Sequence, residues 1–138
     1  MEKVENAKRS RPNFLFEVAN RIRAGETSAV AMGGFLDAYP ASAMGDRPSF
    51  LQERPGSLDL SDPWRTRVMD ASLSAVAEFL ACRDRLPAPD WVFDREYFLD
   101  RPLFACSSDG MRPLLIMESP VSFRRRNLFV SKNALSRA

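Results

Sequence analysis

The longest regular apolar pattern in this sequence begins at Pro63 and ends near Asp84, and it constrains the fold more than any other segment. The residues of the pattern recur at the spacing of one helix face: Trp64, Val68, Met69, Leu73, Val76, Phe79 and Leu80. Ser61 or Asp62 can cap the first turn, where proline is tolerated because its missing N–H would have no intrahelical partner. We therefore predict a central helix, with charged residues such as Glu78 largely off its apolar face.

Two shorter amphipathic patterns precede this helix. Asn13 can cap a helix that buries Leu15 and Ile22 on one face, and Gly25 follows where that helix would close. Thr27 or Ser28 can cap a second helix, which is interrupted by the pair at residues 33–34; we expect these glycines to permit a close helix contact. No nucleotide-binding glycine pattern surrounds them.

The remaining elements are predicted to be short. In chain order we expect a helix near Ser49 within an otherwise irregular connection at 37–62, a helix at 94–99, at most a minor strand or two among 112–117 and 128–130, a helix from Val121 to Arg126 closed at Asn127, and a terminal turn after Ser131. The apolar runs at 103–104 and 114–117 are too short for periodicity to distinguish a strand from a buried helix. Prolines and glycines separate these pieces, so none of them can be long.

The fold class that follows is all-α or predominantly α. A chain of 15.6 kDa with 45% hydrophobic residues is the size of one ordinary domain. Residues 1–12 are polar and lack a periodic apolar pattern, which is typical of a terminal tail. We predict a polar tail at 1–12 and a single compact helical domain at 13–138.

The residue types present disfavour most catalytic chemistry. The chain contains no histidine, and all of its basic residues except Lys3, Lys8 and Lys132 are arginine. Without imidazole, the chain lacks the side chain most often used for acid–base catalysis, and it cannot build a conventional catalytic triad or a zinc site with histidine ligands. Cys82 and Cys106 fit neither a disulfide framework nor a metal motif, and we expect both to be reduced thiols. We therefore expect no cofactor, no metal and no catalytic residues.

The sequence also predicts a location. No apolar run approaches the roughly 20 residues that span a bilayer, and Met1 is followed by charged residues and not by a secretion signal. We expect a soluble, cytoplasmic protein of bacterial type with no membrane partner.

Charge is unevenly distributed along the chain. Residues 46–109 hold eight basic and twelve acidic side chains, whereas residues 111–138 hold six basic and one acidic. Arg124, Arg125 and Arg126 are consecutive in the basic part, with Phe123 and Phe129 beside them. Guanidinium groups suit carboxylates and phosphates, so this segment is the candidate site for binding an anion or an acidic protein partner.

Two other interpretations of the basic segment stay open. In the first, one or two of the three arginines pair with acids of the middle block, which would make their role structural. Alternatively, they could bind nucleic acid. The aromatic residues that could stack on bases are Trp91, Phe93, Tyr97, Phe104, Phe123 and Phe129. We expect most of these rings to lie in the core, which disfavours a stacking surface.

An enzymatic alternative would use carboxylates. Asp90, Asp94 and Glu96 lie close together in the sequence and could bind a cation or transfer protons if they converged in a pocket. They are interleaved with Arg95 and Arg101, which favours surface ion pairs. A small enzyme with a carboxylate site is therefore the second alternative, after nucleic-acid binding.

Several segments resemble small uncharacterised bacterial proteins. The likeness rests on Trp91, on Phe98-Leu99-Asp100-Arg101-Pro102, on Phe104, and on Glu118-Ser119-Pro120 with Phe123 to Val130. Residues 22–26 and 35–37 look similar to the same group, so the likeness covers residues 14–138. Such proteins are associated with toxin–antitoxin or mobile-element loci, which implies a non-enzymatic, antitoxin-like or regulatory partner protein. The resemblance brings no catalytic residue.

Overall fold

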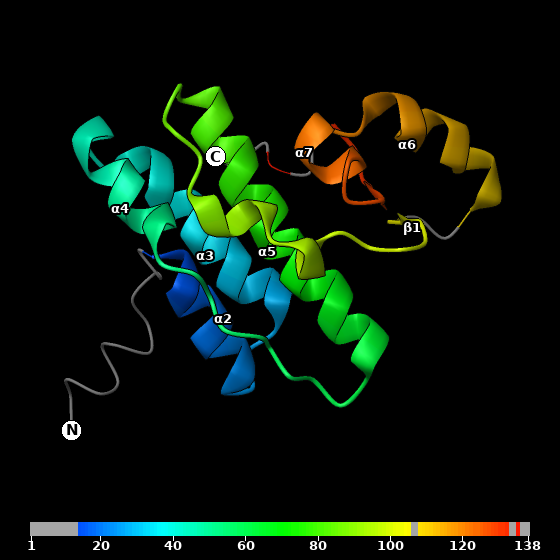
Figure 1. Ribbon diagram of the computed structural model, residues 1–138, viewed down its shortest axis with the longest axis horizontal. Coiled ribbons are helices and arrows are strands. Elements are labelled where there is room, and N and C mark those ends of the chain that lie inside the picture. The colour runs from blue at the N-terminus through cyan, green and yellow to red at the C-terminus, as the bar shows by residue number, and fades with distance from the viewer. Residues whose placement is uncertain (1–13, 106–107, 133–134, 136–138) are drawn as a thin grey trace.

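One long helix, α5 (Pro63–Arg83), runs through the middle of the molecule. The computed structural model describes residues 14–105, 108–132 and 135. Helices α2 (Leu15–Arg23), α3 (Ser28–Ala41) and α4 (Arg47–Gln52) lie on one side of α5, and α6 (Arg112–Glu118) and α7 (Val121–Arg124) lie on the other (Figure 1). The fold is a predominantly helical, compact domain, as the sequence predicts.

The central helix begins as predicted, because the Asp62 side chain accepts a hydrogen bond from the backbone N–H of Trp64. Its burial differs from the prediction. Between Ala71 and Ala81 nearly every position is buried, including Ser74 and Glu78. The apolar stripe is therefore only part of the contact surface, and the expectation that Glu78 lies off the packed face is wrong. The small residues on the remaining faces let neighbouring segments approach this helix from several sides.

Helices α2 and α3 form an antiparallel pair joined at Gly25. Thr27 caps α3 as predicted, with its Oγ1 accepting from the Val30 N–H at 3.3 Å. The predicted cap of α2, Asn13, lies outside the described residues; Glu17 accepts the Phe14 N–H at 3.0 Å instead. Helix α3 also extends further than predicted, to Ala41.

Replacing Gly25 with alanine should lower the free energy of unfolding by about 1–2 kcal/mol. Gly25 has a φ of +108°, a backbone conformation that L residues rarely adopt, and a Cβ there would meet no atom within 4 Å. The cost is therefore one of backbone conformation and not of a clash. Chemical denaturation followed by circular dichroism measures it.

Gly45→Ala is the matched control, because a Cβ at Gly45 also meets nothing within 4 Å and its φ is not positive. It should change the free energy of unfolding by less than about 1 kcal/mol, in the stabilising direction. Equal effects of the two substitutions would contradict the conformational explanation.

The connection between α3 and α5 is more ordered than its prolines and glycines suggest. A 3-10 turn, η1 (Met44–Asp46), leads into α4, which confirms the predicted helix near Ser49. Asp84, just after α5, accepts hydrogen bonds from the Tyr39 hydroxyl at 2.9 Å and the Arg47 guanidinium at 3.2 Å. These bonds tie the ends of α3 and α5 to the start of α4.

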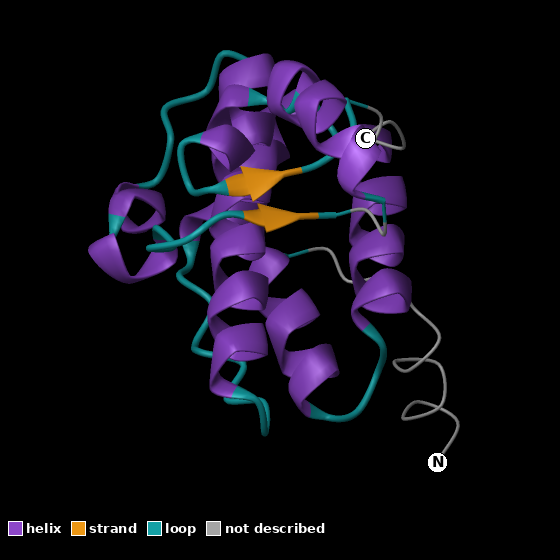
Figure 2. Cartoon of the chain, turned by 90° about the vertical axis from the view of Figure 1, so that its right-hand side faces the viewer, coloured by secondary structure: helices purple, strands orange, loops and turns teal. Residues whose placement is uncertain are grey.

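The C-terminal third consists of short elements. After α5 come two 3-10 turns, η2 (Asp90–Phe93) and η3 (Arg95–Tyr97), which replace the predicted helix at 94–99. Strand β1 (Leu103–Phe104) then pairs in parallel with β2 (Leu128–Phe129), with Leu103 opposite Leu128 (Figure 2). In the sequence, η4 (Asp109–Met111), α6 and α7 come between the two strands.

The prediction allowed at most a minor strand or two among 112–117 and 128–130; β2 lies within the second range, whereas the first range forms α6. The partner strand at 103–104 was not identified, because a two-residue apolar run carries no periodicity. Helix α7 ends at Arg124, two residues earlier than predicted, and Asn127 adopts a φ of +63° that turns the chain into β2. The predicted turn after Ser131 falls partly outside the described residues.

Candidate functional site

Arg126 lies in the core and not on the surface. It is the largest of the fully buried side chains, with no exposed area. Its guanidinium donates to the Ser74 hydroxyl at 2.8 Å, to a Glu78 carboxylate oxygen at 2.6 Å and to the backbone carbonyls of Ser122 and Val92, each at 2.6 Å. The Phe98 ring covers the guanidinium, with 4.7 Å between its central carbon and the ring centroid. Arg126 therefore holds the C-terminal third against α5.

Glu78 binds two of the three consecutive arginines. Its second carboxylate oxygen lies 3.2 Å from Nη1 of Arg125, whose side chain remains 44% exposed. Burial lowers the pKa of the Arg126 guanidinium, and the hydrogen bond and charge of Glu78 oppose that effect. The interpretation that one or two arginines pair with an acid of the middle block is confirmed for both Arg125 and Arg126.

The aromatic residues of the predicted site, Phe123 and Phe129, already pack against other parts of the protein. Phe123 is buried, and Phe129 is half-buried and stacks on Phe104 with 4.9 Å between ring centroids. The prediction that Arg126 and Phe123 contact a partner is wrong for this fold, because both are enclosed by the core. Of the six rings considered for base stacking, Trp91, Tyr97 and Phe123 are buried, Phe104 and Phe129 are half-buried, and Phe93 is 49% exposed.

Arg124 lies at the surface beside α6. It is exposed, and its Nη1 donates to the backbone carbonyl of Ile116 at 3.3 Å. No ion pair joins Arg124 to any carboxylate of the described residues. Of the five predicted site residues, Arg124 and Arg125 are therefore those that present charge to solvent.

Helix α6 exposes apolar side chains on most of its circumference. Only Leu115 of this helix is buried, whereas Leu114 is 42%, Ile116 45% and Met117 79% exposed. Met111 just before α6 and Val121 of α7 are 43% and 55% exposed. Large apolar side chains are usually buried, so the exposure of three of them on one short helix is unusual for a folded domain. We call these five side chains the apolar edge.

Basic groups border the apolar edge. Arg112 lies at the start of α6 with its guanidinium over the Phe104 ring at 4.9 Å and 3.3 Å from Asp109. Arg124 lies over the end of α6, and Arg125 lies near α5. Between Met111 and Lys132, Glu118 is the sole acidic residue of the sequence. Asp109 and Glu78 pair with Arg112 and Arg125, so Arg124 is the one of these three arginines without a carboxylate partner among the described residues.

A hollow of about 310 Å³ separates α5 from α7 at one end of the apolar edge. Phe79 and Cys82 of α5 line it on one side and Pro120 and Val121 on the other. The remaining lining residues are Glu78, Arg83, Ser122 and Arg125. The Ser122 hydroxyl oxygen is buried and has no hydrogen-bond partner among the described residues, which is unusual in a folded protein. The free cysteine Cys82 is exposed there.

The three carboxylates of the enzymatic alternative do not converge. Arg54 lies 2.9 Å from the Asp94 carboxylate and also binds Glu96, and the side chains of these two acids are 40% and 59% exposed. Asp90 instead lines a separate hollow. No group of three or more cysteine, aspartate or glutamate residues suited to a metal ion occurs in the described part of the chain. The expected surface ion pairs are what the structure contains, although Arg54 and not Arg95 provides the cation.

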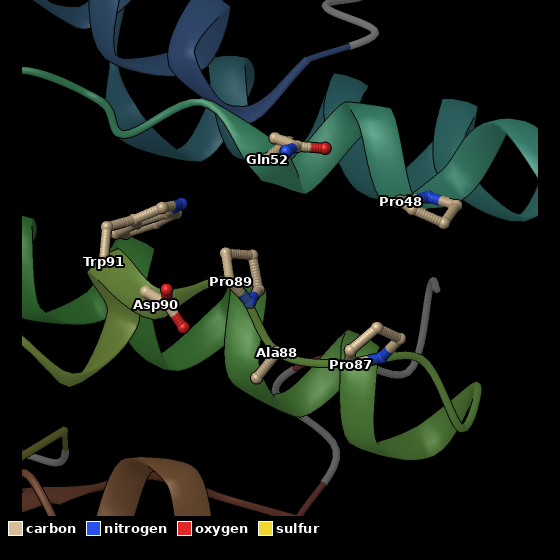
Figure 3. Close-up of a pocket in the computed structure, with 7 residues that line it drawn as sticks. All are labelled: Pro48, Gln52, Pro87, Ala88, Pro89, Asp90 and Trp91. Carbon is tan, nitrogen blue, oxygen red and sulfur yellow. The ribbon is translucent and has the colours of Figure 1, made fainter.

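That separate hollow, of about 420 Å³, lies between α4 and the segment after α5. Pro48 and Gln52 face Pro87, Pro89, Asp90 and Trp91 across it (Figure 3). Trp91 is 8% exposed, and its indole N–H already donates to the Leu51 carbonyl at 3.0 Å. None of its lining residues carries a buried side-chain polar atom without a partner. It offers less to a ligand than the hollow between α5 and α7.

Comparison of the chain with protein-family models, with curated proteins and with solved structures gave no match. Among the described residues, no helix is both long enough and apolar enough to cross a membrane. A functional proposal must therefore rest on the surface chemistry of the molecule itself.

The apolar edge was missed in the sequence because the apolar run at 114–117 was expected to be either a minor strand or a buried helix, and neither leaves it exposed. Two features could have indicated it. Pro113 stands where a helix tolerates proline, in its first turn, and the apolar run that follows does not alternate with polar residues as a half-buried strand would. Burial of Leu115 alone could not be predicted, since it depends on how α6 packs on β2.

Proposed function

We propose that this protein is a non-enzymatic protein-interaction module that binds its partner through the apolar edge and the arginines around it. The observation that carries the proposal is the exposure of Leu114, Ile116 and Met117 on a helix that buries a single residue. Apolar groups gathered at one site, rimmed by polar groups, are typical of protein-binding surfaces. Arg112, Arg124 and Arg125 would favour an acidic partner and speed its association.

The resemblance to proteins of toxin–antitoxin and mobile-element loci supports a regulatory or antitoxin-like role for such a module. Nucleic-acid binding receives less support from the geometry. Arg126 is enclosed and Arg125 shares Glu78 with it, so Arg124 is the one member of the triplet without a carboxylate partner among the described residues. Phosphate binding depends on several free cations acting together.

The test is affinity capture from extracts of the cells that naturally make this protein. The wild-type protein should retain a stoichiometric partner, and Met117→Glu should lose it, because a carboxylate would replace the most exposed apolar contact. Size-exclusion chromatography and native mass spectrometry of the purified complex give the stoichiometry. Identification of the partner then decides between an antitoxin-like and another regulatory role.

Val30→Glu is the matched control, since Val30 is 62% exposed and belongs to α3, a helix on the opposite side of α5 from α6 (Figure 1). This variant should capture the partner as the wild type does, and circular dichroism should show both variants folded. Failure to recover a stoichiometric partner, or equal capture by Met117→Glu, would refute the proposed function. Retention of nucleic acid in place of protein would favour the alternative.

A further inference from the structure

We infer that the hollow between α5 and α7 binds an apolar anchor side chain of an acidic peptide segment, whose carboxylates pair with Arg125 and Arg124. This inference rests on the proposed function and identifies the partner chemistry and the anchoring position. The occupant is a short segment of another protein in which leucine or an aromatic residue is flanked by aspartate or glutamate.

The walls of the hollow favour an apolar group. Phe79, Pro120 and Val121 present carbon atoms, and Cys82 presents a thiol of weak polarity. A volume of about 310 Å³ is at the small end of ligand sites, which suits one or two side chains better than a large cofactor. Val121 belongs both to this hollow and to the apolar edge, so a segment bound along α6 can reach it.

Ser122 places one polar group in the lining of the hollow. The residue is 6% exposed, and its hydroxyl oxygen has no partner among the described residues. A buried hydroxyl without a hydrogen bond destabilises the free protein, and a bound backbone amide or carbonyl could remove that cost. The hollow therefore combines apolar walls with one polar group that lacks a partner, and pockets that are mostly apolar with a few polar groups are typical of binding sites.

The arginines beside the hollow favour a partner segment that carries negative charge. Arg125 is 44% exposed while bound to Glu78, and a guanidinium has donors left for a second carboxylate. Glu78 also holds Arg126, so it keeps a cationic partner when Arg125 turns toward a ligand. A symmetric dimer through the same surface would bring Arg112, Arg124 and Arg125 against their own copies, which disfavours a second copy of this chain as occupant.

The probe is a display library of short random peptides selected against the full-length protein. Selected peptides should combine acidic residues with leucine or an aromatic residue, and their affinity should fall as salt increases. Val121→Glu should weaken the best peptide at least about tenfold, and Arg125→Gln should weaken it less. Val30→Glu should bind as the wild type does. Val121 is 55% exposed, so its substitution should leave the fold intact.

A second readout needs no change in the hollow. In a Cys106→Ser background Cys82 is the sole thiol, and the bound peptide should slow its alkylation by iodoacetamide. Unchanged alkylation, peptides without acidic residues, an empty selection, or a concentration-dependent dimer that Val121→Glu abolishes would each overturn the inference.

The two proposals can fail separately. If the natural partner is lost from Met117→Glu but retained by Val121→Glu, and Cys82 stays reactive in that complex, the hollow is not used and the proposed function stands. If both Met117→Glu and Val121→Glu retain the partner, the proposed function and the inference about the hollow both fail.

Discussion

Arg126→Met should lower the free energy of unfolding by about 3–5 kcal/mol. The substitution keeps much of the apolar length of the side chain but removes the donors to Ser74, Glu78, Ser122 and Val92. It leaves the buried Glu78 carboxylate with the partly exposed Arg125 as its remaining cation, and it leaves two carbonyls without their charged donor. Buried polar groups that lose a partner cost more than the hydrogen bonds themselves contribute. Urea unfolding followed by circular dichroism gives the difference between variant and wild type.

Two further variants separate this effect from a general loss of positive charge. Arg125→Met removes the neighbouring guanidinium, which binds the same carboxylate but is 44% exposed, and it should cost no more than about 1 kcal/mol. Adding Glu78→Leu to Arg126→Met should recover part of the loss, because it removes the stranded charge. Equal losses of unfolding free energy for Arg125→Met and Arg126→Met would show that Arg126 does not hold the C-terminal third against α5.

Phe35→Ala should also lower the free energy of unfolding by about 3–5 kcal/mol. Phe35 of α3 has no exposed area, and its ring centroid lies 5.8 Å from that of Tyr39. Truncation leaves a cavity where α3 faces the rest of the core, and close-packed neighbours relax into such a cavity only partly. The fluorescence of the tryptophans, including buried Trp91, follows the unfolding transition.

The same truncation at an exposed ring provides the control. Phe93 on η2 is 49% exposed, and Phe93→Ala should change the free energy of unfolding by less than about 0.5 kcal/mol. A large effect at Phe93 and a small one at Phe35 would mean that the core is not where the structure has it.

The run of arginines at 124–126 does not form one charged surface. Three adjacent arginines share one sequence pattern, yet the structure gives them three different environments. Arg126 is enclosed, Arg125 is half of a surface ion pair, and Arg124 is exposed next to α6. Neighbouring residues on a turn project in different directions, so a charge run in a sequence does not define a charged surface. Of the three adjacent arginines, Arg124 and Arg125 remain as candidates for contact with an acidic partner.

The elements that the sequence determined are those whose signals are local. Asp62 and Pro63 placed the start of α5, Thr27 placed that of α3, and Gly25 marked the end of α2, because caps and a positive φ depend on a few neighbouring atoms. The predominantly helical fold followed from apolar periodicity over a long segment. The short helix near Ser49 followed from the rarity of long irregular connections.

Tertiary structure decided everything that depends on residues far apart in the sequence. The pairing of Leu103 with Leu128, the burial of Arg126 against Glu78 and the hollow between α5 and α7 each join segments that a local pattern cannot relate. The apolar residues of α6 look like core residues in the sequence. They are exposed because the short helix meets the rest of the chain mainly through Leu115, and that contact geometry exists only once the chain has folded.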